Sequence, residues 1–162
     1  MHRRRTDMLI KNFPIKTAGS GDNASLTVYI LDGSTDYEHS VRPLVLICPG
    51  GGYEFVSTKE GEPMALQFTA MGYHAAILRY SVRPAVYPTQ LLEAAAAWKI
   101  IREHAEEWNV QADKIIIEGG SAGGHLAASY GIFCGEDIIT NSVGLSADEL
   151  RPAETILCYP VI

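Results

Sequence analysis

The sequence predicts an α/β fold: a mostly parallel β-sheet flanked by helices on both faces. Short continuous apolar runs, typical of strands buried on both faces, alternate with segments of helical periodicity. Two of these runs lead directly into glycine-rich stretches, at the sheet edge where such folds bind ligands. The 162 residues, 47% of them hydrophobic, suit one domain over 1–162. We expect an irregular amino-terminal segment over 1–22.

Five strands are expected. The first is rich in β-branched and aromatic residues, and the others are short, nearly continuous apolar runs. The chain stops inside or just after the last run. The expected strands are 24–31, 43–49, 72–80, 114–119 and 155–162.

Three helices are expected between these strands. Pro63 suits the first turn of a helix over 63–71. From 89 to 108 the apolar positions step by three or four, which predicts one continuous helix of about five turns. The third helix should start at or just after Ser121 and end near Gly131. The polar segment 135–154 is interpreted as a loop with at most one short helix.

Charge and composition exclude several classes of partner. The net charge is −6 and the basic residues are dispersed, which disfavours nucleic acid or an anionic membrane as the main partner. No run has the character of a signal peptide or a membrane span. Cys48, Cys134 and Cys158 lack metal-type spacing and are interpreted as reduced thiols. We therefore expect a cytoplasmic protein without a metal site.

The stretch "GGSAG", Gly119 to Gly123, has the pattern G-x-S-x-G between an expected strand and an expected helix. This is the context of a nucleophile elbow, in which a serine sits on a sharp, strained turn. Gly119, Gly120 and Gly123 let the strand and helix backbones pass closely. Ser121 at the helix N-terminus faces backbone N–H groups that favour developing negative charge. Ser121 is therefore the candidate nucleophile.

Two alternatives to the nucleophile elbow remain open. A bare G-x-S-x-G can be a glycine-rich turn without chemistry, since the chain has 15 glycines. A phosphate-binding loop is disfavoured, because neither G-x-x-x-x-G-K-[ST] nor G-x-G-x-x-G is present.

A second glycine-rich stretch, "CPGGGY" over 48–53, follows the expected strand 43–49. An acyl-transfer serine needs N–H donors for the oxyanion, from the residue after it, here Ala122, and from a loop after an earlier strand. Consecutive glycines allow such a close approach, although a plain flexible turn is the alternative. If both loops serve one site, the strand near 114–118 should lie centrally in the sheet with that near 44–48 beside it.

Five motifs follow one another along the chain: "CPGGGY", "LRYSVRP", "YPTQLLEAAAAWKIIREHAEEWNV", "DKIIIEGGSAGGHLAAS" and "LCYPVI". In this order they resemble the α/β-hydrolase superfamily. Over about residues 25–162, the chain is most similar to bacterial carboxylesterases of the acetylxylan-esterase-like or sugar-esterase-like group, relatives of the hormone-sensitive-lipase group. One departure is Pro49, where the hormone-sensitive-lipase group has histidine.

The resemblance implies hydrolysis of a carboxylic ester, such as a short acyl (acetyl) ester of a sugar. It implies Ser121 as nucleophile and the amides of Gly51, Gly52 and Ala122 as the oxyanion hole. No metal or organic cofactor is implied, the partner is a small-molecule ester, and a homo-oligomer is compatible with the sequence. A serine peptidase or amidase of the same fold, or a non-catalytic hydrolase-like binding module, are the alternatives.

In this superfamily the catalytic triad runs serine, then Asp or Glu, then histidine along the chain. No such pair of an acid followed by a histidine is evident after Ser121. His125 is the one histidine there, on a helix that points away from the reaction centre, and we expect it to pack or hydrogen-bond beneath the elbow. Asp137, Asp148 and Glu149 are interpreted as solvated surface charges. We expect the 162 residues to be the amino-terminal part of a longer hydrolase. This part should lack two further strands of the sheet and should be inactive alone. The earlier histidines are His2, His39, His74 and His104.

Overall fold

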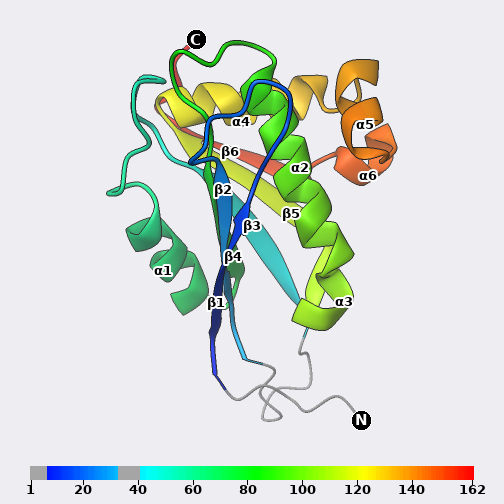
Figure 1. Cartoon of the computed structure of the whole chain (residues 1–162). Coiled ribbons are helices and arrows are strands. Elements are labelled where there is room, and N and C mark those ends of the chain that lie inside the picture. Colours follow the sequence, from blue (N-terminus) through cyan, green and yellow to red (C-terminus); the bar gives the residue numbers. More distant parts are fainter. Residues whose placement is uncertain (1–6, 33–40) are drawn as a thin grey trace.

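The computed structural model describes residues 7–32 and 41–162 (Figure 1). These residues form six strands and six helices in an α/β arrangement. The strands are β1 (Leu9–Pro14), β2 (Ser25–Ile30), β3 (Arg42–Cys48), β4 (His74–Arg79), β5 (Val110–Gly120) and β6 (Glu154–Cys158). The helices are α1 (Glu62–Ala70), α2 (Thr89–Glu103), α3 (Ala105–Trp108), α4 (Ala122–Phe133), α5 (Asp137–Val143) and α6 (Ala147–Leu150).

The strands form one mixed, mostly parallel sheet in the order β1-β2-β4-β3-β5-β6. β4, β3, β5 and β6 run parallel, and β1 and β2 pair antiparallel at one side. The expected neighbours β3 and β5 pair directly, with Cys48 opposite Gly119. The expected central position of β5 is not found among the described strands. β5 is internal, but it lies next to the edge strand β6.

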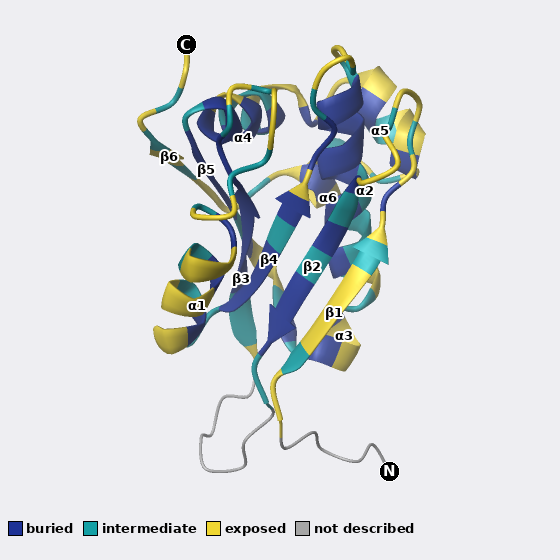
Figure 2. Cartoon of the chain, turned by 60° about the vertical axis from the view of Figure 1, so that its left-hand side comes forward, coloured by how far each residue is buried: buried dark blue, intermediate teal, exposed yellow. Residues whose placement is uncertain are grey.

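Helices cover both faces of the sheet, as the sequence predicts (Figure 1). The alternation along β3 shows the two cores. Leu44, Leu46 and Cys48 face the larger core beneath α2 and α4, whereas Val45 and Ile47 face the smaller core beneath α1. Burial on both faces explains why these strands are continuous apolar runs (Figure 2).

The amino-terminal segment 1–22 is not wholly irregular, because β1 lies within it. β1 pairs only with β2 and forms an edge of the sheet, and four of its six residues are exposed (Figure 2). An edge strand with a solvent-exposed face and a lysine in its middle contains no continuous apolar run. The apolar signal that predicts the other strands is therefore absent from β1.

The expected continuous helix over 89–108 is broken at His104, which separates α2 from α3. The backbone of His104 has ψ near 4°, outside the helical range. Its Nδ1 lies 2.8 Å from the Ile100 carbonyl oxygen, and its ring stacks on Trp108 with the centroids 4.4 Å apart. The side chain thus bonds a helical carbonyl and packs across the break, a contact that apolar periodicity does not reveal.

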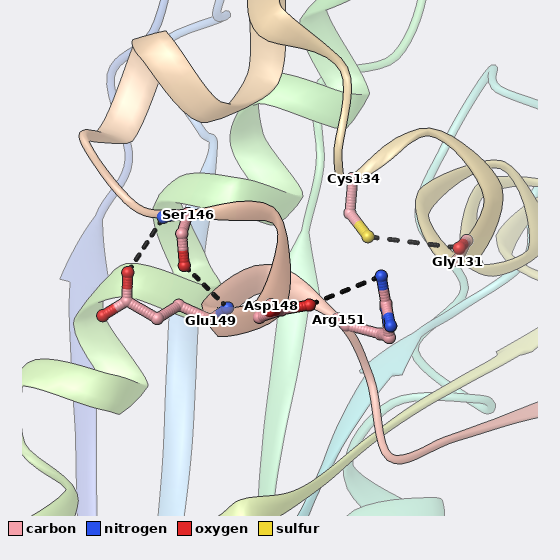
Figure 3. Close-up of polar contacts among 6 residues, drawn as sticks. All are labelled: Gly131, Cys134, Ser146, Asp148, Glu149 and Arg151. Atoms are coloured by element: carbon pink, nitrogen blue, oxygen red, sulfur yellow. Dashed lines mark hydrogen bonds and ion pairs between the residues drawn. The ribbon is translucent and has the colours of Figure 1, made fainter.

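The segment 135–154 contains two helices, α5 and α6, rather than one at most. α6 begins with a capping box: Ser146 Oγ accepts from the Glu149 N–H at 3.2 Å, and the Glu149 carboxylate accepts from the Ser146 N–H at 2.9 Å (Figure 3). Ile139 of α5 and Leu150 of α6 enter the larger core, and both short helices pack against α2.

Candidate active site

Ser121 occupies the sharp turn between β5 and α4, with φ 51° and ψ −119°. A non-glycine residue rarely adopts positive φ, so the expected strain at this turn is confirmed. Hydrogen bonds fix the turn: Ser121 N–H donates to the Cys158 carbonyl at 3.0 Å, and the Ser121 carbonyl accepts from His125 and Val161. β6 and the residues after it therefore hold the serine backbone.

The glycines around Ser121 mark close approaches of backbone. A Cβ atom on Gly119 would lie 2.1 Å from the Gly123 carbonyl oxygen, and one on Gly123 would lie 1.8 Å from the Cys48 carbonyl oxygen. A Cβ on Gly120 would meet Tyr159 Oη at 3.1 Å and Glu60 Oε2 at 3.2 Å. All three glycines thus allow the turn to pack against β3, α4 and the segment after β6.

The second glycine-rich loop, 49–53, leaves the same edge of the sheet as Ser121, because β3 and β5 are parallel and paired. A Cβ on Gly50 would lie 3.1 Å from Ser121 Cβ, so the two loops are in contact. Gly51 and Gly52 have φ of 136° and 65°, conformations that favour glycine. Among the described residues, no acceptor engages the N–H groups of Gly51 and Gly52. Both N–H groups belong to the loop that contacts the Ser121 turn through Gly50.

A cavity of about 920 Å³ opens beside this loop. Its walls come from the loop, the segment 83–91 and α4, and they are largely apolar, with Arg83, Gln90 and Ser129 as polar groups. At its rim Tyr53 Oη lies 2.8 Å from His125 Nδ1. The volume is in the range of small-molecule sites.

His125 does not contact Ser121 through its side chain but pairs with Tyr53, also ring edge to ring face at 5.8 Å. The His125 side chain therefore forms a hydrogen bond, as expected, but the expected place beneath the turn is wrong, because the side chain is solvent-exposed at the cavity. His74 is buried on β4, where its Nδ1 accepts from Leu31 N–H at 3.1 Å. His104 lies at the break after α2. His2 and His39 lie outside the described residues.

Two acidic side chains near Ser121 were not identified from the sequence. Glu118, next to the G-x-S-x-G stretch, is 3% exposed, and burial raises its pKa to about 7, although a hydrogen bond with Cys158 opposes this. Glu60 lies in the turn before α1, and its carboxylate accepts from Gly50 N–H and Tyr159 Oη. The position of Glu118 beside the motif was a usable signal, whereas nothing local distinguishes Glu60.

Asp137, Asp148 and Glu149 are exposed, as expected, and lie on α5 and α6. Figure 3 shows Asp148 paired with Arg151 at 3.5 Å and Glu149 in the capping box, whose hydrogen bonds lower the Glu149 pKa. Glu149 therefore caps α6, and Asp148 forms an exposed ion pair with the residue that follows this helix. Figure 3 also shows Cys134 Sγ directed at the Gly131 carbonyl.

The cysteines Cys48, Cys134 and Cys158 are free thiols. Within residues 7–32 and 41–162, no group of three histidine, cysteine or acidic side chains is placed to hold a metal ion. In the same part of the chain, no helix has the length and apolarity needed to cross a membrane.

The fold and the paired glycine-rich loops define the chain as an α/β hydrolase. The BD-FAE family profile matches residues 31–154, and the chain belongs to this family of α/β-hydrolase carboxylesterases related to acetylxylan esterases.

Relatives agree with this assignment. The chain is 32% identical over 125 residues to an endo-1,4-beta-xylanase B of Butyrivibrio fibrisolvens, covering 75% of the chain and 20% of that protein. It is 30% identical over 115 residues to an acetylxylan esterase of Xylanibacter ruminicola, covering 70% and 22%. The α/β hydrolase MGS-M1, from a Medee basin deep-sea metagenome library, superposes with a TM-score of 0.80 at 36% identity, over 98% of the chain and 59% of that structure. The chain thus spans about a fifth of the curated relatives and three fifths of this structure.

Proposed function

We propose that these residues belong to a serine hydrolase that cleaves carboxylic esters through an acyl-enzyme on Ser121. The observation that carries the proposal is the contact between the two loops. Ser121 sits at a strained turn with φ 51°, and the loop beside it presents the unengaged N–H groups of Gly51 and Gly52. A nucleophilic hydroxyl and oxyanion donors are the two parts that acyl transfer requires.

The proposed reaction has two steps. The Ser121 hydroxyl loses its proton to a general base as its oxygen attacks the ester carbonyl, and the N–H groups of Gly51, Gly52 and Ala122 stabilise the oxyanion. The alcohol leaves with a proton, and water then cleaves the acyl-serine ester to release the acid. We assign the base and its acidic partner to residues outside the described part, since none of the described histidine side chains hydrogen-bonds to Ser121.

The proposed substrate is a short acyl ester, such as an acetyl ester of a sugar. Support comes from homologues, which include carboxylesterases and acetylxylan esterases. The cavity at Gly52 and Tyr53 would accept one side of such an ester, with the apolar wall of α4 and the polar Arg83 and Gln90 opposite. No organic or metal cofactor takes part, and a cytoplasmic location completes the proposal.

The test compares wild type with Ser121→Ala in the full natural polypeptide, using p-nitrophenyl acetate, an acetylated xylo-oligosaccharide and an aminoacyl-anilide. Ser142→Ala, on α5, is the matched control and should retain activity. We expect ester turnover that depends on Ser121 and exceeds anilide turnover. Preferential anilide cleavage would favour the peptidase or amidase alternative. Absence of Ser121-dependent turnover on all three would favour a binding module.

A further inference from the structure

Glu60 connects the loop after β3 with the segment after β6 through a single carboxylate. Its Oε2 accepts the Gly50 N–H at 2.5 Å, and its Oε1 accepts the Tyr159 hydroxyl at 3.0 Å. Gly50 lies in the loop after β3, whereas Tyr159 directly follows β6. Glu60 itself is half-buried in the turn before α1. Three segments far apart in the sequence therefore meet at this carboxylate.

The glycine pattern leaves room for this carboxylate. A Cβ atom on Gly50 would lie 2.6 Å from Glu60 Oε2, and a Cβ on Gly120 would lie 3.2 Å from the same oxygen. One glycine comes from each loop, and any larger side chain at either position would crowd the carboxylate. Gly120, the last residue of β5, thus leaves room for the Glu60 carboxylate as well as for the turn at Ser121.

The peptide unit between Pro49 and Gly50 is held at both of its polar ends. The Tyr80 hydroxyl donates to the Pro49 carbonyl at 2.5 Å, and the N–H of the same unit donates to Glu60. Burial raises the Tyr80 pKa, which keeps the hydroxyl protonated and able to donate. Tyr80 and Glu60 therefore each restrain one end of this peptide unit.

The orientation of this peptide unit sets the direction in which the loop continues. The next two residues, Gly51 and Gly52, have positive φ, and glycine without a restraint is conformationally free. We propose that Glu60 is a positioning residue: by fixing the Pro49–Gly50 peptide it aims the N–H groups of Gly51 and Gly52 at the oxyanion. This inference rests on the proposed function, and Glu60 does not touch the substrate.

The experiment uses the full natural polypeptide and three variants. Glu60→Ala removes the acceptor, Glu60→Gln keeps its volume and one oxygen acceptor, and Glu62→Ala is the matched control. Glu62 lies two residues away on α1, and its carboxylate accepts from Tyr29 Oη at 2.8 Å rather than from Gly50. The readouts are kcat and KM with p-nitrophenyl acetate, the affinity for a boronic acid that forms a tetrahedral adduct on serine, and the melting temperature.

For Glu60→Ala we expect kcat and boronic-acid affinity to fall about 10²-fold, since misplaced groups cost about that much. KM should change less than about threefold, because ground-state binding is untouched. Glu60→Gln should recover about tenfold of the loss. Glu62→Ala should match wild type. A kcat for Glu60→Ala within threefold of the Glu62→Ala value would overturn the proposal, as would a loss that follows the melting temperature and is not recovered by glutamine.

A second measurement is independent of turnover. In protein labelled with ¹⁵N-glycine, the Gly50 amide proton should resonate far downfield and move upfield in Glu60→Gln but not in Glu62→Gln. An unmoved Gly50 resonance would overturn the contact itself. If wild type shows no Ser121-dependent turnover while Gly50 moves as expected, the proposed function has failed and the catalytic positioning role falls with it, whereas the Glu60–Gly50 contact stands.

Discussion

The Cys48 carbonyl oxygen lies 1.8 Å from the point that a Cβ atom on Gly123 would occupy. β3 ends at Cys48, and α4 carries Gly123 directly above it. The helix that follows Ser121 can approach the neighbouring strand only because this position has no side chain. The close contact brings the loop after β3 and the turn at Ser121 to one point.

Gly123→Ala should therefore destabilise the fold strongly, by about 3 kcal/mol, because neither backbone segment can move away without disturbing a buried strand. Gly144→Ala is the matched control. Gly144 has φ 70° and open space around its Cβ position, so only the backbone conformation is penalised, by about 1 kcal/mol. Urea unfolding of the two variants checks the difference, and equal midpoints would contradict this packing.

Glu93 on α2 is fully buried and accepts hydrogen bonds from three polar groups. Its carboxylate accepts from Ser20 Oγ and Ser81 N–H, each at 2.7 Å, and from Ser81 Oγ. Glu93→Ala would leave these donors unpaired and should cost about 3 kcal/mol of unfolding free energy. Glu103→Ala, which removes only an exposed ion pair with Lys99, should cost less than about 0.5 kcal/mol. Chemical denaturation distinguishes the two, and a small effect of Glu93→Ala would show that water replaces the carboxylate.

Glu118 should make stability depend on pH. Its pKa is about 7 in the fold, against an ordinary 4.5, because burial disfavours the charged form. Between these two pH values the unfolded chain is ionised while the folded chain holds the proton. The free energy of unfolding therefore falls as pH rises through this interval, by up to about 3 kcal/mol at about 1.4 kcal/mol per pH unit, and levels off above pH 7.

Glu118→Gln should flatten that interval in denaturation curves measured from pH 4.5 to 8, and exposed Glu103→Gln should not. Glu60 adds to the raised Glu118 pKa through charge repulsion. Glu60→Gln should thus shift the fall in stability to lower pH. A wild-type profile that is flat across the interval would contradict the raised pKa.

The parts of the fold predicted from the sequence are those with a local physical signal. Val45 and Ile47 alternate with Leu44 and Leu46 between two cores, so burial on both faces makes a continuous apolar run. The strained serine turn was predictable because glycines two residues before and after Ser121 are needed for close backbone approach.

The parts that were not predicted depend on contacts distant in sequence. β1 is defined by pairing with β2, and its lysine-containing sequence has one wet face. Glu60 meets Tyr159 across 99 residues, and neither residue has a local pattern that marks it. The break at His104 depends on stacking with Trp108, which periodicity alone assigns to the same helix.

His125 should not be the general base of the proposed reaction. Its Nδ1 is engaged by Tyr53 at the rim of the cavity. In the full polypeptide, His125→Gln should keep kcat within about tenfold of wild type while KM changes through the cavity wall. Loss of a triad histidine costs far more, about 10⁴-fold or above in kcat. Steady-state kinetics on a p-nitrophenyl ester decide between these outcomes, and a loss of the larger size would reassign His125 as the base.

The last prediction concerns residues 1–162 produced alone. Without a base, the Ser121 hydroxyl stays protonated near neutral pH and is a poor nucleophile. The side chains of the described histidines bond to Tyr53, Leu31 and Ile100 rather than to the Ser121 hydroxyl. Only the residual catalysis of an oxyanion hole, about 10³–10⁴ over water, would remain. We therefore expect ester turnover no higher than that of a Ser121→Ala control, measured on the isolated chain after circular dichroism has verified its fold. Robust hydrolysis that depends on Ser121 would contradict this, and would require a base from His125, from the residues outside the described part, or from a second subunit.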